Sequence, residues 1–124
     1  MVPDGDAFIE RFLRAFNDLD PEAIAALATD DILLETSFGA EAWGTRVVGR
    51  AAVRAFYVDM FERVPDARWD ELRRIVCPPH IVVESLATGT PRGGTRFETT
   101  LCDVLTLRDG LMAAKRSYRK IAAL

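Results

Sequence analysis

The apolar positions of the chain repeat with two different periods, and these periods predict two helices, a strand, a third helix and then four strands. Apolar residues recur every three or four positions in a stretch that ends near Asn17 and again over Gly49–Val64, which predicts two amphipathic helices. Either Asp4 or Asp6 can cap the first of them. Between them, an acid followed by proline marks the start of a short helix running from Pro21 to about Ala28.

The remaining stretches, which are separated by proline and glycine turn signals, predict strands. The expected strands are 31–38, 68–77, 80–90 and the two arms of a hairpin over 94–118 that turns at Asp109-Gly110. Long strands joined by short turns favour antiparallel pairing, and helices collected ahead of the sheet favour an α+β fold. We expect a cone-shaped, curved, mostly antiparallel sheet wrapped around three N-terminal helices, with an internal cavity at one end.

One acid falls on the inner face of the closing hairpin. Alternation places Asp103 there, on a face otherwise made of Phe97, Thr99, Leu101, Leu105 and Leu107. Burying a carboxylate without partners costs several kcal/mol, so this residue needs either a fixed partner or a cavity where its charge is used. A three-residue turn with a bulge puts Lys115 opposite Asp103, whereas a two-residue turn puts Arg116 there. The two roles are compatible, because a paired aspartate can still face a ligand.

The other titratable residues offer fewer candidates. Glu35 and Glu98 fall on faces expected to be solvated, whereas Glu84 lies in a strand that is equally apolar on both sides and is a weaker candidate for an inward acid. His80 is the only histidine and follows two prolines at a strand start, where a surface role is typical. The sequence has no metal-ligand spacing, no glycine-rich nucleotide motif and no GxSxG motif, so we expect no metal and no cofactor.

Several side chains on the expected inner faces are candidates for the wall of a ligand cavity, although the same residues can form an ordinary core. Trp43, in a short extra strand or in a lid, and Tyr57 are favoured because their polar atoms need a partner when buried. The candidate ligand-binding residues are Phe12, Phe16, Thr36, Trp43, Phe56, Tyr57, Met60, Trp69 and Tyr118.

Composition and charge narrow the class of protein. The 124 residues fit a single domain over 1–124, and 49% hydrophobic residues are enough for a core without disulfides. Cys77 and Cys102 form no CxxC motif and are expected to be free thiols. A net charge of -3 gives no support to a nucleic-acid or membrane partner. The N-terminus lacks the features of a secretory signal, so we expect a cytoplasmic protein.

A resemblance to a known family rests on three stretches of the sequence. They read FLRAFNDLDPEAIAALATDDI, VVGRAAVRAFYVDMF and ATGTPRGGTRFETTLCDVLTLRDGLM. They resemble the paired N-terminal helices, the third helix and the closing strands of the SnoaL-like polyketide cyclase group of the nuclear-transport-factor-two-like superfamily. The resemblance covers nearly the whole chain and implies the cone fold. It does not fix the chemistry, because this superfamily contains isomerases, cyclases, epoxide hydrolases, dehydratases and plain binding domains.

The resemblance can be carried onto individual positions. Ketosteroid isomerases of this superfamily use a tyrosine, an aspartate base and a protonated acid at positions that resemble Phe12, Thr36 and Asp103 here, so only the acid is retained. Limonene epoxide hydrolases use a last-strand aspartate at a position that resembles Ser117. SnoaL-like cyclases use an aspartate as acid/base without a cofactor, and the resemblance implies that role for Asp103.

Together these features favour a cofactor-independent small-molecule enzyme, a cyclase or isomerase acting on an apolar polyketide- or terpenoid-like substrate. Asp103 would be the acid/base, Thr36 and Tyr57 would orient the ligand, and Trp43 and Phe56 would form walls. The alternative is a non-catalytic ligand-binding or dimerisation module of the same fold, which the missing isomerase base and tyrosine favour. The strand around Val104 is apolar on both faces, so we expect a homodimer through the sheet.

Overall fold

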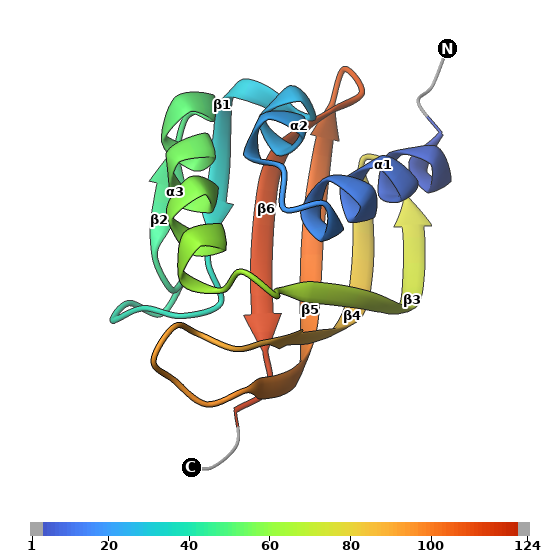
Figure 1. Ribbon diagram of the computed structural model, residues 1–124. Coiled ribbons are helices and arrows are strands. Elements are labelled where there is room, and N and C mark those ends of the chain that lie inside the picture. The colour runs from blue at the N-terminus through green and yellow to red at the C-terminus, as the bar shows by residue number, and fades with distance from the viewer. Residues whose placement is uncertain (1–3, 122–124) are drawn as a thin grey trace.

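The computed structural model describes residues 4–121, which form three helices on the concave side of one curled, unclosed sheet of six strands (Figure 1). The helices are α1 (Gly5–Asn17), α2 (Pro21–Ala26) and α3 (Arg50–Arg63). The strands are β1 (Ala28–Glu35), β2 (Arg46–Val48), β3 (Arg68–Cys77), β4 (His80–Gly89), β5 (Phe97–Arg108) and β6 (Leu111–Arg119). They are ordered β2-β1-β6-β5-β4-β3, and only β1 and β6 are parallel neighbours. The expected α+β cone is confirmed.

Two of the three helices, α1 and α2, begin at aspartate caps. The Asp4 carboxylate accepts a hydrogen bond from the Asp6 backbone N–H at 3.0 Å, and the Asp20 carboxylate accepts one from the Ala23 N–H at 3.1 Å. These bonds satisfy backbone donors that lack partners in the first helical turn. The apolar stripes of α1 and α3 then pack against the sheet and against each other through Phe8, Ile9, Phe12, Phe16, Val53, Tyr57 and Phe61.

The segment after β1 differs from the expectation of a strand over 31–38. The strand ends at Glu35, and Phe38 lies beyond it with 55% of its surface exposed. The Thr36 hydroxyl donates to the Phe38 carbonyl at 2.6 Å and accepts from the Thr45 N–H at 3.1 Å. These bonds fold the chain back into β2, which pairs antiparallel with β1, and Trp43 lies in the turn before β2.

The register of the closing hairpin contradicts both expected alternatives, because Asp103 lies opposite neither Lys115 nor Arg116. Its cross-strand partner is Ser117. The turn at Asp109-Gly110 has two residues, both with positive φ, but a bulge near Thr106 adds one residue to β6 and shifts the register. The inner face of β6 therefore presents Lys115 and Ser117 side by side next to Asp103.

Two other strand carboxylates, Glu35 and Glu84, lie on the outer face of the sheet. Glu35 points outward as expected, but the expectation of a solvated role is wrong, since only 8% of its surface is exposed. Its carboxylate lies between Arg46 at 2.9 Å and Arg116 at 3.3 Å, and these side chains cover it. Glu84 also points outward and pairs with Arg73 at 3.2 Å, so it is not an inward acid.

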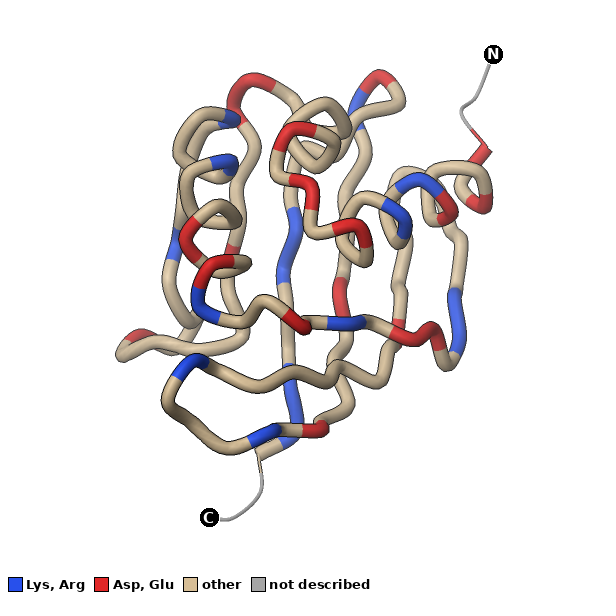
Figure 2. The backbone as a smooth tube through the Cα atoms, in the orientation of Figure 1, with Lys and Arg blue, Asp and Glu red and all other residues tan. Residues whose placement is uncertain are grey.

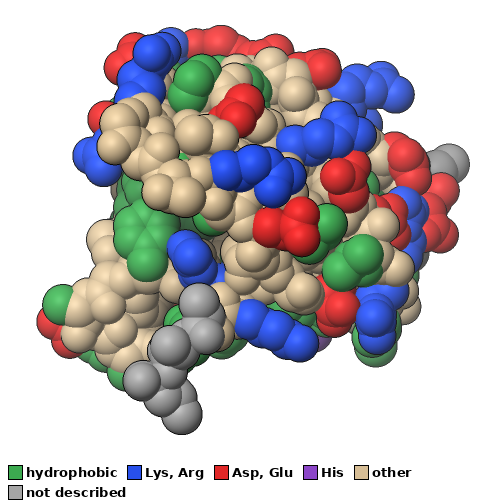
Figure 3. Space-filling model, turned by 60° about the horizontal axis from the view of Figure 1, so that its bottom comes forward, with side chains coloured by type: hydrophobic (Ala, Val, Ile, Leu, Met, Phe, Trp, Pro, Cys, Tyr) green, Lys and Arg blue, Asp and Glu red, His purple; other side chains and the backbone are tan. Residues whose placement is uncertain are grey.

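Charged residues lie mainly on helices, loops and the sheet periphery and interrupt the central strands β5 and β6 at only a few points (Figure 2). Both cysteines are free thiols, as expected. None of the helices within residues 4–121 is long and apolar enough to cross a membrane. The end of the cone where β1 and β6 finish carries a mixture of acidic, basic and apolar side chains (Figure 3).

Candidate active site

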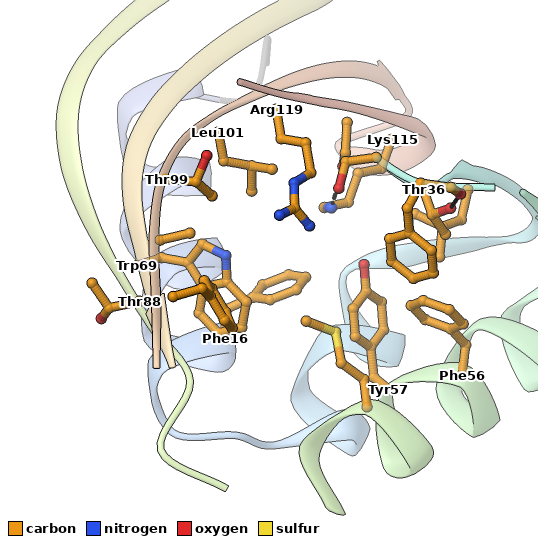
Figure 4. A pocket seen from close by; sticks show the side chains of 17 residues that line it. Phe16, Thr36, Phe56, Tyr57, Trp69, Thr88, Thr99, Leu101, Lys115 and Arg119 are labelled. Carbon is orange, nitrogen blue, oxygen red and sulfur yellow. Dashed lines mark hydrogen bonds between the residues drawn. The ribbon is translucent and has the colours of Figure 1, made fainter. Parts of the chain in front are cut away.

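A cavity of about 100 Å³ lies between the helices and the sheet at the end where β1 and β6 finish (Figure 4). Its walls are mostly apolar because α1, α3 and the sheet all turn their hydrophobic faces toward it. The main apolar contributors are Phe16, Leu34, Phe56, Met60, Trp69 and Leu101. The three helices therefore do not fill the concave side of the sheet completely.

A polar cluster from β5 and β6 borders this cavity. The Ser117 hydroxyl donates to Asp103 Oδ1 at 2.5 Å, and Lys115 Nζ donates to Ser117 Oγ at 2.8 Å. Lys115 Nζ also lies 3.3 Å from Asp103 Oδ1, and the two side chains are only 7% and 4% exposed. The buried acid is thus compensated by one cation and one hydroxyl, as burial of a charge requires.

The cluster meets the cavity through only some of its members. Ser117 and Lys115 line the cavity, whereas Asp103 lies behind them. Tyr57 from α3 and Arg119 from the end of β6 also line it, and Figure 4 shows their polar ends converging near Lys115. Four side chains from one helix and one strand therefore bring charged or hydroxyl groups to a mainly apolar space, beside the hydroxyls of Thr36, Ser37, Thr88 and Thr99.

The electrostatics of the cluster keep two of these groups protonated. Burial raises the pKa of the Tyr57 hydroxyl, and the Asp103 charge acts in the same direction against the opposing effect of Lys115. Burial works against the charge of Lys115, but the Asp103 carboxylate and the Tyr57 hydroxyl outweigh it, so the pKa of the amine is raised. Both groups are hydrogen-bond donors at neutral pH.

The structure brings most, but not all, of the sequence-derived ligand-binding candidates to the cavity. Those that line it are Phe16, Thr36, Phe56, Tyr57, Met60 and Trp69. Phe12 does not, because it is buried in the core with its ring centroid 4.7 Å from that of Phe16. Trp43 and Tyr118 also lie outside the cavity. Trp43 stacks on the Arg46 guanidinium at 4.2 Å, and Tyr118 points outward because its neighbours on β6 point inward.

Trp43 and Tyr118 instead line an open outer groove of about 610 Å³ at the same end of the molecule. The groove and the cavity share Thr36, Ser37, Phe38, Ser117 and Arg119. These shared residues form the mouth of the cavity, so a ligand in the cavity can extend into the groove.

Lys115, Ser117 and Arg119 were not among the site residues predicted from the sequence. Their alternation in the segment AKRSYR was a usable signal, since it places all three on one face of β6. Which face turns inward depends on the bulge, and nothing in the residue types of the hairpin marks where that bulge lies. Within residues 4–121 no group of three or more His, Cys, Asp and Glu residues is placed to hold a metal ion.

Solved structures with the same fold include proteins of several descriptions. A hypothetical protein from Catenulispora acidiphila with a ketosteroid isomerase-like fold, in complex with trimethylamine, has a TM-score of 0.80 at 16% identity, covering 90% of this chain and 83% of that one. A candidate polyketide cyclase from Xanthomonas campestris has a TM-score of 0.79 at 18% identity, with coverages of 91% and 87%. A candidate SnoaL-like polyketide cyclase from a Jannaschia species has a TM-score of 0.74 at 20% identity, with coverages of 91% and 85%.

At these identities the structural likeness establishes the fold alone. No curated protein matches the chain significantly in sequence. The family described as the SnoaL-like domain, however, matches residues 9–115, from α1 to the inward-facing lysine of β6. Because the match spans most of the sequence, the chain belongs to the SnoaL-like domain family.

Proposed function

We propose that this protein is a cofactor-independent enzyme of the isomerase or cyclase type that moves a proton on a small, largely apolar substrate. The observation that carries the proposal is the buried cluster of Asp103, Ser117 and Lys115, which opens onto an apolar cavity through its hydroxyl and its ammonium group. Its carboxylate lies one hydroxyl away from the cavity, so Ser117 can relay a substrate proton to it.

Asp103 acts through Ser117, because the hydroxyl stands between the carboxylate and the cavity. A C–H bond next to a substrate carbonyl breaks, and its proton moves to Ser117 Oγ. The hydroxyl proton of Ser117 moves at the same time to Asp103 Oδ1. The electron pair of the broken bond passes to the carbonyl oxygen, giving an enolate.

Lys115 and Tyr57 stabilise the negative oxygen that forms. Both are held in their protonated form, and both reach the cavity from opposite walls (Figure 4). Preorganised donors in a site that excludes water are worth much more than the same donors in solution. Return of the proton to another carbon completes an isomerisation, whereas attack of the enolate carbon on a second carbonyl, followed by protonation of its oxygen, closes a ring.

The size of the cavity constrains the substrate. Small-molecule pockets are usually about 300–1,000 Å³, so a space of about 100 Å³ suits a compact body rather than a fused polyketide skeleton. A larger polyketide- or terpenoid-like substrate would leave part of its length in the outer groove, where Trp43 and Tyr118 would contact it. Thr36 lies at the mouth and would orient the substrate there.

The proposal is tested by proton exchange, because the natural substrate need not be known. Small cyclic ketones are incubated with the protein in D₂O, and loss of the α-proton signals is followed by NMR. Exchange is expected for the parent protein and should fall about 100-fold or more in Asp103→Asn, the scale of general acid–base catalysis. Ser117→Ala should have a similar effect while leaving the pair of Lys115 and Asp103 intact. Glu98→Gln, an exposed carboxylate on the same strand, is the matched control.

Two results would contradict the proposal. The first is proton exchange at the parent rate in both Asp103→Asn and Ser117→Ala, which would show that the cluster takes no part in proton transfer. The second is binding of the ketones without any exchange, which would favour a non-catalytic ligand-binding module.

A further inference from the structure

We infer that the substrate carries an ionised carboxylate and that Arg119 binds it at the mouth of the cavity. The inference rests on the proposed function, since it names the class of substrate for the same cavity. It arises from the charges that line the cavity, from the position of Arg119 on β6 and from the kind of polar groups that face the space.

The lining of the cavity is positively charged. It includes the side chains of Lys115 and Arg119 and no aspartate or glutamate. The charge of Lys115 is balanced by Asp103, 3.3 Å away behind the wall. The charge of Arg119 has no such balance, because among residues 4–121 no side chain or carbonyl forms an ion pair or hydrogen bond with it. The neighbouring outer-face arginines, Arg46 and Arg116, both bind Glu35.

Arg119 is placed to bind an anion entering the cavity. It lies opposite Leu101 on β5, so its side chain starts from the inner face of the sheet. Figure 4 shows its guanidinium reaching over the cavity toward Lys115 and the Tyr57 hydroxyl. Arg119 also lines the outer groove, so it stands where the cavity opens to solvent.

Three of the other polar groups around the cavity are donors, beside the hydroxyls of Thr36, Ser37, Thr88, Thr99 and Ser117, which can donate or accept. The Tyr57 phenol and the Lys115 ammonium both remain protonated at neutral pH. The indole nitrogen of Trp69, a donor only, lies on the cavity side in Figure 4. A ligand rich in acceptor oxygens satisfies such a set, and a carboxylate also neutralises the remaining charge.

A guanidinium binds a carboxylate through two parallel hydrogen bonds, which fixes the orientation of the ligand as well as its position. With its carboxylate on Arg119, a compact acid would direct its apolar body between Phe16, Phe56 and Trp69. Its reacting carbon would then lie near Ser117, and a ketone oxygen near Lys115 and Tyr57. The substrate class is therefore a compact keto acid, with the carboxylate as anchor and the ketone as reacting group.

Binding of simple probes tests the anchor without turnover. In a Trp43→Phe background, Trp69 is the only tryptophan and its fluorescence reports on the cavity. Cyclopentanecarboxylate is titrated at neutral pH alongside cyclopentanecarboxamide, which has the same shape and no charge. The acid is expected to bind about tenfold more tightly than the amide, the scale of a charged hydrogen-bonded contact. Arg119→Gln should reduce this ratio to about one.

Arg73→Gln is the matched control, because it removes an exposed arginine from the outer face and should leave the preference for the acid unchanged. Equal binding of acid and amide by the parent protein, no measurable binding of the acid, or a preference that survives Arg119→Gln would overturn the inference. If this binding test fails while the parent protein still catalyses proton exchange, only the inferred substrate carboxylate is disproved. If the protein prefers the acid over the amide but catalyses no proton exchange, the proposed chemistry is disproved and the anion-binding role of Arg119 is supported.

Discussion

Replacing Lys115 by methionine is the perturbation that most directly tests the buried cluster. Methionine keeps a similar length and an apolar stem but removes the charge, so Asp103 would keep only the Ser117 hydroxyl as a partner. Both side chains of the pair are nearly inaccessible to water, at 7% and 4% exposure, so solvent cannot replace the lost cation. We expect Lys115→Met to fold with a strongly reduced free energy of unfolding.

The size of the loss follows from the geometry. Two unit charges separated by 3.3 Å attract by about 5 kcal/mol at an effective dielectric constant of about 20. A buried carboxylate that has lost its cation can take up a proton instead of staying charged. Protonating an ordinary carboxyl at pH 7 costs about 4 kcal/mol, and this cost sets an upper limit on the destabilisation. Removing one partner of a buried pair typically costs about 3–5 kcal/mol. We therefore expect a loss of about 3–4 kcal/mol at pH 7.

Urea unfolding of Lys115→Met, Asp103→Leu and the double variant measures this loss and its cause. If a carboxylate without its cation causes the loss, the difference in free energy of unfolding between the parent and Lys115→Met should be smaller at about pH 5, where protonating a carboxyl costs less. It also predicts that the double variant is more stable than the sum of the single changes by about 2 kcal/mol or more. The partly exposed pair of Arg73 and Glu84 is the control, with an expected contribution below about 1 kcal/mol. A deficit below about 1 kcal/mol at pH 7, or one independent of pH, would refute the reasoning.

Two further predictions concern the rest of the fold. Arg74 binds Asp6 at 3.1 Å, Glu10 at 2.7 Å and Glu71 at 2.6 Å, so Arg74→Met should loosen α1 from β3 and lower the free energy of unfolding by about 1 kcal/mol. The hydrogen bond from Arg74 lowers the pKa of Glu71 below its usual 4.5. The stabilisation is therefore complete above pH 4.5 and is lost as the pH falls through the lowered pKa of Glu71 in the folded protein. If urea unfolding shows that acid destabilises the parent and Arg74→Met equally, this prediction is contradicted. We also propose that the outer face of the sheet forms a homodimer, because Ile75, 59% exposed, continues an apolar row across Val82 and Val104. Light scattering should give a dimeric mass for the parent at micromolar concentration and a monomeric mass for Ile75→Glu, and a monomeric parent would contradict the proposal.

The fold was predictable from the sequence because its signals are local. The apolar stripe of α3 and the cap at Asp4 require only neighbouring residues to be interpreted. The end of β1 was not predictable in this way. Thr36 continues the alternation of the strand, but its hydroxyl bonds to Phe38 and Thr45 fold the chain back. Those bonds depend on tertiary placement rather than on the pattern.

The site was only partly predictable for a related reason. Alternation placed Asp103 on the inner face, where it is indeed buried, and a basic partner from β6 was expected. The identity of the residue opposite depends on a one-residue bulge, and a shift of one residue reverses which side chains of β6 face inward. Tyr118 was therefore expected near the cavity, whereas Ser117 and Arg119 occupy that face.

The position of the pair of Lys115 and Asp103 argues for function rather than stability. Replacing a buried ion pair by apolar residues of similar volume is often neutral or stabilising. Leucine and methionine at these two positions should therefore stabilise the fold about as much as the ion pair does. Its neighbours on the inner face, Leu101 and Leu105, show that β5 accommodates apolar side chains there. A double variant Asp103→Leu with Lys115→Met should therefore approach the parent in stability and lose proton exchange completely. A double variant that retains exchange would mean that the cluster serves the fold alone.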